Sequence, residues 1–173
     1  MKFFSGFSLQ NENYLFDKYI KKGAYTVGGF SYGAIKAFQY VKDELEKGKR
    51  IDTLELFSPA FFQTKDTKFK RLQLMAYKKN EMLYLNQFIN KCFDPYEKKI
   101  VEHTATTVDQ LDELLNYQWS LDSLEEIKRL GVEIEVYVGE KDAIVDAEAT
   151  REFFKEVATL TYLKNANHFL QIN

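Results

Sequence analysis

The sequence predicts an α/β protein built on about five parallel strands, with flanking helices and an inserted helical lid. Three observations lead to this prediction. Short apolar runs alternate with amphipathic helical patterns at both ends of the chain, which is typical of strand-helix-strand units around a parallel sheet. The middle of the chain has helical periodicity with no evident strand. The chain has 173 residues, 45% of them apolar, which is enough for one domain with a substantial core.

We expect residues 1–62 and 120–173 to form the α/β core, and residues 63–119 to form the lid. In the first part, a helix is expected at about 11–22, where Gly23 ends it. A second helix follows the second apolar run directly, because apolar residues recur there at spacings of three and four. The three apolar runs expected to form strands are residues 2–7, 24–30 and 53–57.

Beyond the lid, the alternation of helix and strand resumes. The sequence Ser123-Leu124-Glu125-Glu126 has the form of a capping box, so we expect a helix that begins there and ends at Gly131. A strand is expected at 132–138, a helix at 146–157 and a last strand at 159–163. With the first three runs this gives five strands, all expected to be parallel.

The composition excludes several classes of function. With 24 basic and 26 acidic side chains, the formal net charge is −2, so overall charge gives no case for nucleic-acid binding. The single cysteine, Cys92, excludes an internal disulfide and a multi-cysteine zinc site, and two histidines leave little for a metal centre. The apolar run at the amino terminus stops at residues 10–13, too early for a signal peptide. We therefore expect a cytoplasmic protein that binds neither nucleic acid nor membrane.

Ser31 lies in the pentapeptide Gly29-Phe30-Ser31-Tyr32-Gly33, at the junction between an expected strand and the helix after it. A nucleophile on such a sharp turn has a strained backbone, and the flanking glycines remove the side-chain clashes that the turn would otherwise cause. The hydroxyl then lies at the carboxyl edge of the sheet, where open α/β folds bind ligands. The pattern predicts a nucleophile; the alternative is a glycine-rich turn that only packs a helix against a strand.

A serine nucleophile requires a base and a group that orients the base, and both are expected at the ends of later strands. Asp142 follows the strand expected at 132–138, and His168 follows the last strand. Asp142 is the preferred acid because Asp146 is better placed to cap the next helix, although Glu140 and Asp146 stay as alternatives. The chain order Ser, Asp, His is the one expected on this sheet topology.

Together these features resemble the α/β-hydrolase family. The resemblance implies a serine carboxylic-ester hydrolase with an acyl-enzyme intermediate and no metal or organic cofactor. In it, Ser31 is the nucleophile, His168 the base and Asp142 the orienting acid. The segments that carry the resemblance are residues 27–33, 56–60, 124–145 and 167–170.

The opening Phe4-Ser5-Gly6-Phe7-Ser8 and the short chain are similar to the small atypical pimeloyl-[acyl-carrier protein] methyl ester esterases of biotin synthesis. This resemblance implies that the backbone amides of Phe7 and Tyr32 form the oxyanion hole. The chain has Ser5-Gly6 where larger family members have His-Gly, but a hole made of backbone amides does not need the histidine side chain. The alternatives are a general carboxylesterase or thioesterase, and a non-catalytic binding protein on a hydrolase scaffold.

The expected lid carries a basic segment. Residues 61–79 contain six basic side chains and the single acid Asp66, which gives +5. Such a run is usually a solvated helix face, but it could also attract an acidic partner, and the resemblance favours acyl carrier protein bearing the substrate. The residues expected to dock the carrier are Lys65, Lys68, Lys70 and Arg71. His103 also lies in the expected lid, and we interpret it as a surface or lid residue. Cys92 lies there too, and we interpret it as structural.

Overall fold

The structure is a computed structural model that describes residues 1–173. At its centre lies a five-stranded sheet with strand order β1-β3-β4-β6-β7, in which every neighbouring pair is parallel. The expected five parallel strands and the α/β class are therefore confirmed. The strands are β1 (Lys2–Phe4), β3 (Thr26–Phe30), β4 (Thr53–Phe57), β6 (Glu133–Gly139) and β7 (Thr159–Leu163).

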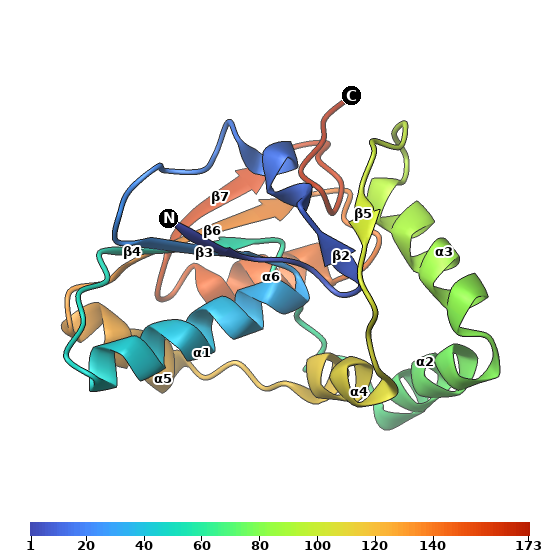
Figure 1. The fold of residues 1–173 in the computed structure, drawn as a ribbon, viewed down its shortest axis with the longest axis horizontal. Helices are drawn as coiled ribbons and strands as arrows, with labels where there is room; N and C mark the ends of the chain where they lie inside the picture. The colour runs from blue at the N-terminus through green and yellow to red at the C-terminus, as the bar shows by residue number, and fades with distance from the viewer.

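Helices cover one face of this sheet (Figure 1). The opposite face is covered by the short 3-10 helix η1 (Glu12–Phe16) and by the segment that follows β7. Phe16 packs there between the rings of Phe30 and Phe57, with centroid distances of 5.0 and 4.9 Å. Both faces of the sheet are thus buried, as expected for a parallel sheet. The helices on the first face are α1 (Tyr32–Glu46), α5 (Leu121–Arg129) and α6 (Ala147–Phe154).

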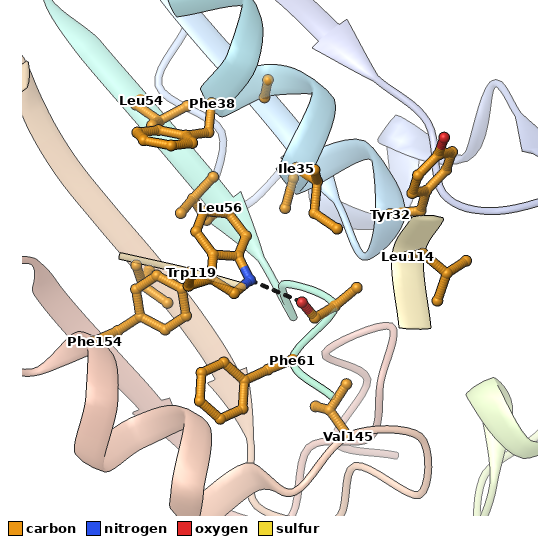
Figure 2. Packing of buried hydrophobic residues seen from close by; sticks show 14 of the residues in the cluster. Tyr32, Ile35, Phe38, Leu54, Leu56, Phe61, Leu114, Trp119, Val145 and Phe154 are labelled. Atoms are coloured by element: carbon orange, nitrogen blue, oxygen red, sulfur yellow. Dashed lines mark hydrogen bonds between the residues drawn. The ribbon is translucent and has the colours of Figure 1, made fainter. Parts of the chain in front are cut away.

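The two ends of the inserted block meet at Trp119 (Figure 2). Its ring packs between Phe38 and Phe154, with centroid distances of 5.6 and 5.1 Å. The indole Nε1 donates to the carbonyl oxygen of Ala60 at 2.8 Å, and the Trp119 amide donates to the side chain of Gln63 at 2.8 Å. These bonds join the start and the end of the insertion to the core.

The insertion lies beyond the carboxyl ends of the strands (Figure 1). We expected no strand in it, and this was wrong, because Glu102–His103 pairs antiparallel with Leu9–Gln10. A two-residue strand is too short to leave a periodic signal in the sequence. None of the helices has the length and apolar character needed to cross a bilayer. The elements not yet bounded are β2 (Leu9–Gln10), α2 (Thr67–Lys79), α3 (Glu81–Phe93), β5 (Glu102–His103) and α4 (Val108–Asn116).

Other expected bounds were also wrong. The strand expected at 2–7 ends at Phe4, and the helix expected at 146–157 ends at Phe154. Two further helices differ from the expectation for reasons that the structure shows. The segment 11–22 forms only η1, because its contacts with the sheet override its helical pattern; the Lys21 amide, for example, donates to the Glu55 side chain on β4 at 2.8 Å. Helix α5 begins at Leu121 rather than near Ser123, because the Ser120 side chain caps it by accepting from the Ser123 amide.

Candidate active site

Ser31 lies at the turn between β3 and α1 with φ 53° and ψ −114°, a strained conformation for a residue with a side chain. The flanking glycines are required there by close backbone contacts. A Cβ on Gly29 would lie 2.2 Å from the carbonyl oxygen of Gly33, and a Cβ on Gly33 would lie 2.0 Å from that of Phe4. The turn therefore has the strained geometry that the pentapeptide predicts, and it lies against the amino-terminal loop.

The structure brings Ser31, His168 and Asp142 together. Nε2 of His168 lies 3.0 Å from the hydroxyl oxygen of Ser31, and Nδ1 of His168 lies 2.6 Å from Oδ2 of Asp142. All three side chains are buried. Oδ1 of Asp142 accepts from the amides of Ile144 and Val145 at 2.8 and 3.0 Å, so the carboxylate is held with its other oxygen facing the imidazole.

The two alternative acids do not contact the imidazole. Asp146 caps α6 by accepting from the Ala149 amide at 3.0 Å. Glu140 accepts from the Asn165 amide at 2.9 Å and so holds the loop that carries His168. The geometry therefore favours Asp142 as the acid that orients the histidine.

Asn167 positions the histidine loop, a role that we did not predict from the sequence. Its side-chain amide donates to the carbonyl oxygen of Phe93, the last residue of α3, at 2.8 Å. The ring of Phe93 packs on Phe169 at 4.3 Å, and the ring of Phe30 packs on His168 at 4.9 Å. The end of α3 thus holds the residues on either side of His168, and Phe30 of β3 packs against the imidazole itself. An asparagine beside the expected base was the only sequence signal for this role.

The two backbone amides expected to form the oxyanion hole, those of Phe7 and Tyr32, donate to no acceptor in the protein. Tyr32 is the first residue of α1, so its amide has no carbonyl one turn before it. The amide of Phe7 has no acceptor in the protein. The loop that carries it is fixed by the Gly6 amide, which donates to Oε1 of Glu12 at 2.7 Å. Glu12 is fully buried, and burial raises the pKa of its carboxyl.

A cavity of about 580 Å³ lies under the lid, and ten of the fifteen residues that line it are hydrophobic. Phe7 and Ile144 line it, so it adjoins both the free amide and the loop that holds Asp142. Ser31 itself is 4% exposed and does not line the cavity. Besides Phe7, four aromatic residues line the cavity, namely Phe62, Phe69, Tyr84 and Phe88.

The basic residues of the lid fall into two groups. Lys68 and Arg71 are exposed on α2 and Lys70 is half-buried, whereas Lys65 lines the cavity. His103 is exposed on β5, in agreement with its interpretation as a surface residue.

Cys92 is a free, fully buried thiol, and burial raises its pKa well above the ordinary value. A thiol in this environment is a packing residue rather than a nucleophile. The structure also has no cluster of three or more His, Cys, Asp or Glu side chains suited to a metal ion.

No protein-family model and no curated protein matches the sequence. Solved structures do match. Est816, described as an N-acyl homoserine lactone degrading enzyme, is 10% identical with a TM-score of 0.62, covering 98% of this chain and 86% of its own. BioG from Haemophilus influenzae is 11% identical with a TM-score of 0.56, covering 97% and 87%. Carboxylesterase CesB from Bacillus subtilis is 17% identical with a TM-score of 0.50, covering 91% and 57%.

Against three Bacillus subtilis structures, the two carboxylesterases CesB and naproxen esterase and a hydrolase, the chain spans 57%, 62% and 54% of their length. It is thus similar to little more than half of these larger proteins. At identities below 25% the likeness concerns the fold. The sheet order, the turn at Ser31 and these matches together show that the chain has the α/β-hydrolase fold.

Proposed function

We propose that this chain is a carboxylic-ester hydrolase that works through a covalent acyl-serine intermediate. The observation that carries the proposal is the buried hydrogen-bonded chain from Ser31 through His168 to Asp142, with distances of 3.0 and 2.6 Å. A hydroxyl in this arrangement can lose its proton to the imidazole as it attacks a carbonyl. The Asp142 carboxylate fixes the tautomer of the imidazole and stabilises its charged form.

The reaction follows from this geometry in two halves. Ser31 attacks the ester carbonyl while Nε2 of His168 takes its proton, and the resulting oxyanion accepts hydrogen bonds from the Phe7 and Tyr32 amides. Each such donor contributes roughly 3 to 4 kcal/mol in comparable sites. His168 then returns the proton to the departing alcohol. Water repeats the sequence on the acyl-serine and releases the acid.

The non-catalytic alternative requires that Ser31 and His168 do not meet. Their 3.0 Å separation, together with the strained turn, supports catalysis over simple binding on this scaffold. The substrate alternatives, a general carboxylesterase or a thioesterase, use the same residues and differ only in what the cavity and the lid admit.

The substrate that we propose is the methyl ester of a pimeloyl chain carried on acyl carrier protein. The opening segment around Ser5-Gly6 supports it by its resemblance to the esterases of biotin synthesis. The lid supports it as well, because Lys68, Arg71, Leu72 and Met75 all lie on α2 with exposed side chains. A helix face that mixes cations with apolar groups fits an acidic, amphipathic partner surface.

Two experiments test this function. A serine-directed phosphonate is expected to label the wild-type protein and to leave Ser31→Ala unlabelled, and that variant is expected to lose turnover of a nitrophenyl ester. Unchanged turnover in Ser31→Ala would overturn the nucleophile assignment. For the substrate, the gene is expected to restore growth without biotin in a bacterial strain that lacks its own methyl ester esterase. A protein that cleaves simple esters but fails to restore growth would point to the general esterase alternative.

A further inference from the structure

We propose that the cavity under the lid holds an acyl chain that carries an anionic group, a carboxylate or a phosphate, and that Lys65 and Lys91 bind this group. The proposal rests on the proposed ester hydrolysis, because it names the substrate class of that same site. The first observation is the composition of the cavity wall. Besides its ten hydrophobic residues, the wall has five polar side chains, all of which can donate hydrogen bonds, and no acid. These five are Lys65, Gln73, Gln87, Asn90 and Lys91.

Neither lysine is neutralised by the protein. No carboxylate lies within ion-pair distance of Lys65 or Lys91, whereas Lys36, for example, pairs with Glu113 at 2.6 Å. Nζ of Lys65 lies 5.5 Å from the centre of the Phe69 ring, which also lines the cavity. Lys65 precedes α2, and Lys91 lies in the last turn of α3, so the two cations reach the cavity from different elements.

The charge of the wall selects among possible ligands. A neutral acyl chain would bury the apolar wall, but it would offer no acceptor to the ammonium groups of half-buried Lys65 and exposed Lys91. A chain that ends in a carboxylate or a phosphate buries the same apolar wall and supplies the missing acceptors. Charge-assisted hydrogen bonds of this kind are about twice as strong as neutral ones. The wall therefore matches several methylene groups followed by an anion.

The same cavity adjoins two segments that flank the reacting groups. Phe7, whose amide is the proposed oxyanion donor, lines it, and so does Ile144, whose amide holds Asp142. The end of α3 beyond Lys91 is tied to the histidine loop by the bond from Asn167 to Phe93. An anionic chain bound in the cavity would thus lie against Phe7 and Ile144, which flank the proposed catalytic groups, whereas Ser31 and His168 do not line the cavity itself.

The test compares three methyl esters of equal chain length whose far end is a methyl group, a carboxylate or a phosphate monoester. We expect the wild-type protein to cleave at least one anionic ester with a kcat/KM about 10-fold above that of the neutral ester. Lys65→Met and Lys91→Met are each expected to lower this ratio several-fold, and Lys→Arg at either position to preserve it. The matched control is Lys79→Met, because Lys79 is exposed on α2, does not line the cavity and is not among the residues expected to dock the carrier.

Each outcome of this comparison leads to a different conclusion. A preference for the carboxylate or for the phosphate identifies the source of the anion. Equal rates on all three esters, or a preference that the double Lys65→Met, Lys91→Met variant retains, would overturn the inference and leave the esterase function intact. If no ester is cleaved and phosphonate does not label Ser31, the proposed function fails instead. The inference is then decided by calorimetric binding of the corresponding anionic acids, which is expected to disappear in the double variant; absence of binding to the wild-type protein would overturn it.

Discussion

The buried carboxyl of Glu12 accepts a hydrogen bond from the amide of Gly6 at 2.7 Å, one residue before the Phe7 amide that faces no acceptor in the protein. This bond fixes the loop between β1 and β2 at the position where it lies against the turn of Ser31. The Gly6 amide is thereby satisfied within the protein, and the Phe7 amide stays available to a ligand. Glu12 is therefore a positioning residue: it holds the loop of the proposed oxyanion hole through Gly6 and does not contact the substrate.

Replacing Glu12 is expected to reduce the rate of catalysis more than substrate binding. Glu12→Ala leaves the Gly6 amide without an acceptor and loosens the loop, so kcat should fall about 10-fold or more with little change in KM. Glu12→Gln keeps a carbonyl oxygen for the amide and should retain most of the activity. Steady-state kinetics and the affinity for a boronic acid, which mimics the tetrahedral intermediate, measure the effect. A loss of kcat in Glu12→Ala without weaker boronate binding would contradict this role.

The choice among three acids for orienting the histidine can be tested by amide substitutions. Asp142→Asn should lower kcat by about 10³- to 10⁴-fold, because the amide favours the wrong imidazole tautomer. Glu140→Gln should have a small effect on kcat, since its side chain only accepts from the Asn165 amide. Asp146→Ala should instead lower the free energy of unfolding by about 1 kcal/mol through loss of the α6 cap. A large drop of kcat in either of these controls would reassign the acid.

The sequence was sufficient for the features that local chemistry determines. Alternating apolar runs predicted the strands of the sheet, with Thr53–Phe57 and Thr159–Leu163 placed to the residue. The glycines around Ser31 predicted a sharp turn, because a Cβ at either position would clash with the neighbouring backbone. The order of Ser31, Asp142 and His168 along the chain predicted which loops meet, because parallel strands end at one edge of the sheet.

Features that depend on contacts between distant segments were missed. The segment 11–22 looks helical in isolation, but its side chains and amides are used by the sheet, as the Lys21 to Glu55 bond shows. The roles of Glu12 and Asn167 depend on partners at Gly6 and Phe93, and neither pair has a spacing that a sequence motif could reveal. Such partners become visible only when the fold has placed them.

Glu55 makes stability depend on pH. It lies in the middle of β4, fully buried, beside Glu135 on β6, and burial followed by that neighbouring carboxylate raises its pKa to about 7. Lys21 donates its amide to Glu55 and pairs with Glu135 through its ammonium group, and the Tyr137 hydroxyl donates to Glu135 at 2.9 Å. One carboxyl oxygen of Glu55 has no partner. The protonated form is therefore the one that the fold prefers.

The sign of the effect follows from the raised pKa. The folded chain holds the Glu55 proton more tightly than the unfolded chain, so the stabilisation is complete below about pH 4.5 and is lost as the pH rises through about 7. Between these limits the loss is about 3 kcal/mol. Chemical denaturation at pH 5 and pH 8 should show this decline in the wild-type protein and a smaller one in Glu55→Gln. Equal declines in the wild-type protein and in Glu55→Gln would show that another group titrates. The control variant is Glu133→Gln, on the neighbouring strand β6.

Reversing the charge of the exposed face of α2 tests whether the lid docks a carrier. Lys68, Lys70 and Arg71, all changed to glutamate, should raise KM for an ester bound to acyl carrier protein about 10-fold or more, because the acidic partner would meet like charges. The same variant should cleave a small ester normally, since none of these side chains lines the cavity. The matched control changes three exposed lysines elsewhere, Lys98, Lys99 and Lys164, to glutamate. If both triple variants lose carrier-bound turnover equally, the loss reflects overall charge; if neither does, the carrier does not bind at α2. A loss confined to the α2 variant and relieved by added salt would locate the contact on that helix, because interactions between exposed charges weaken with ionic strength.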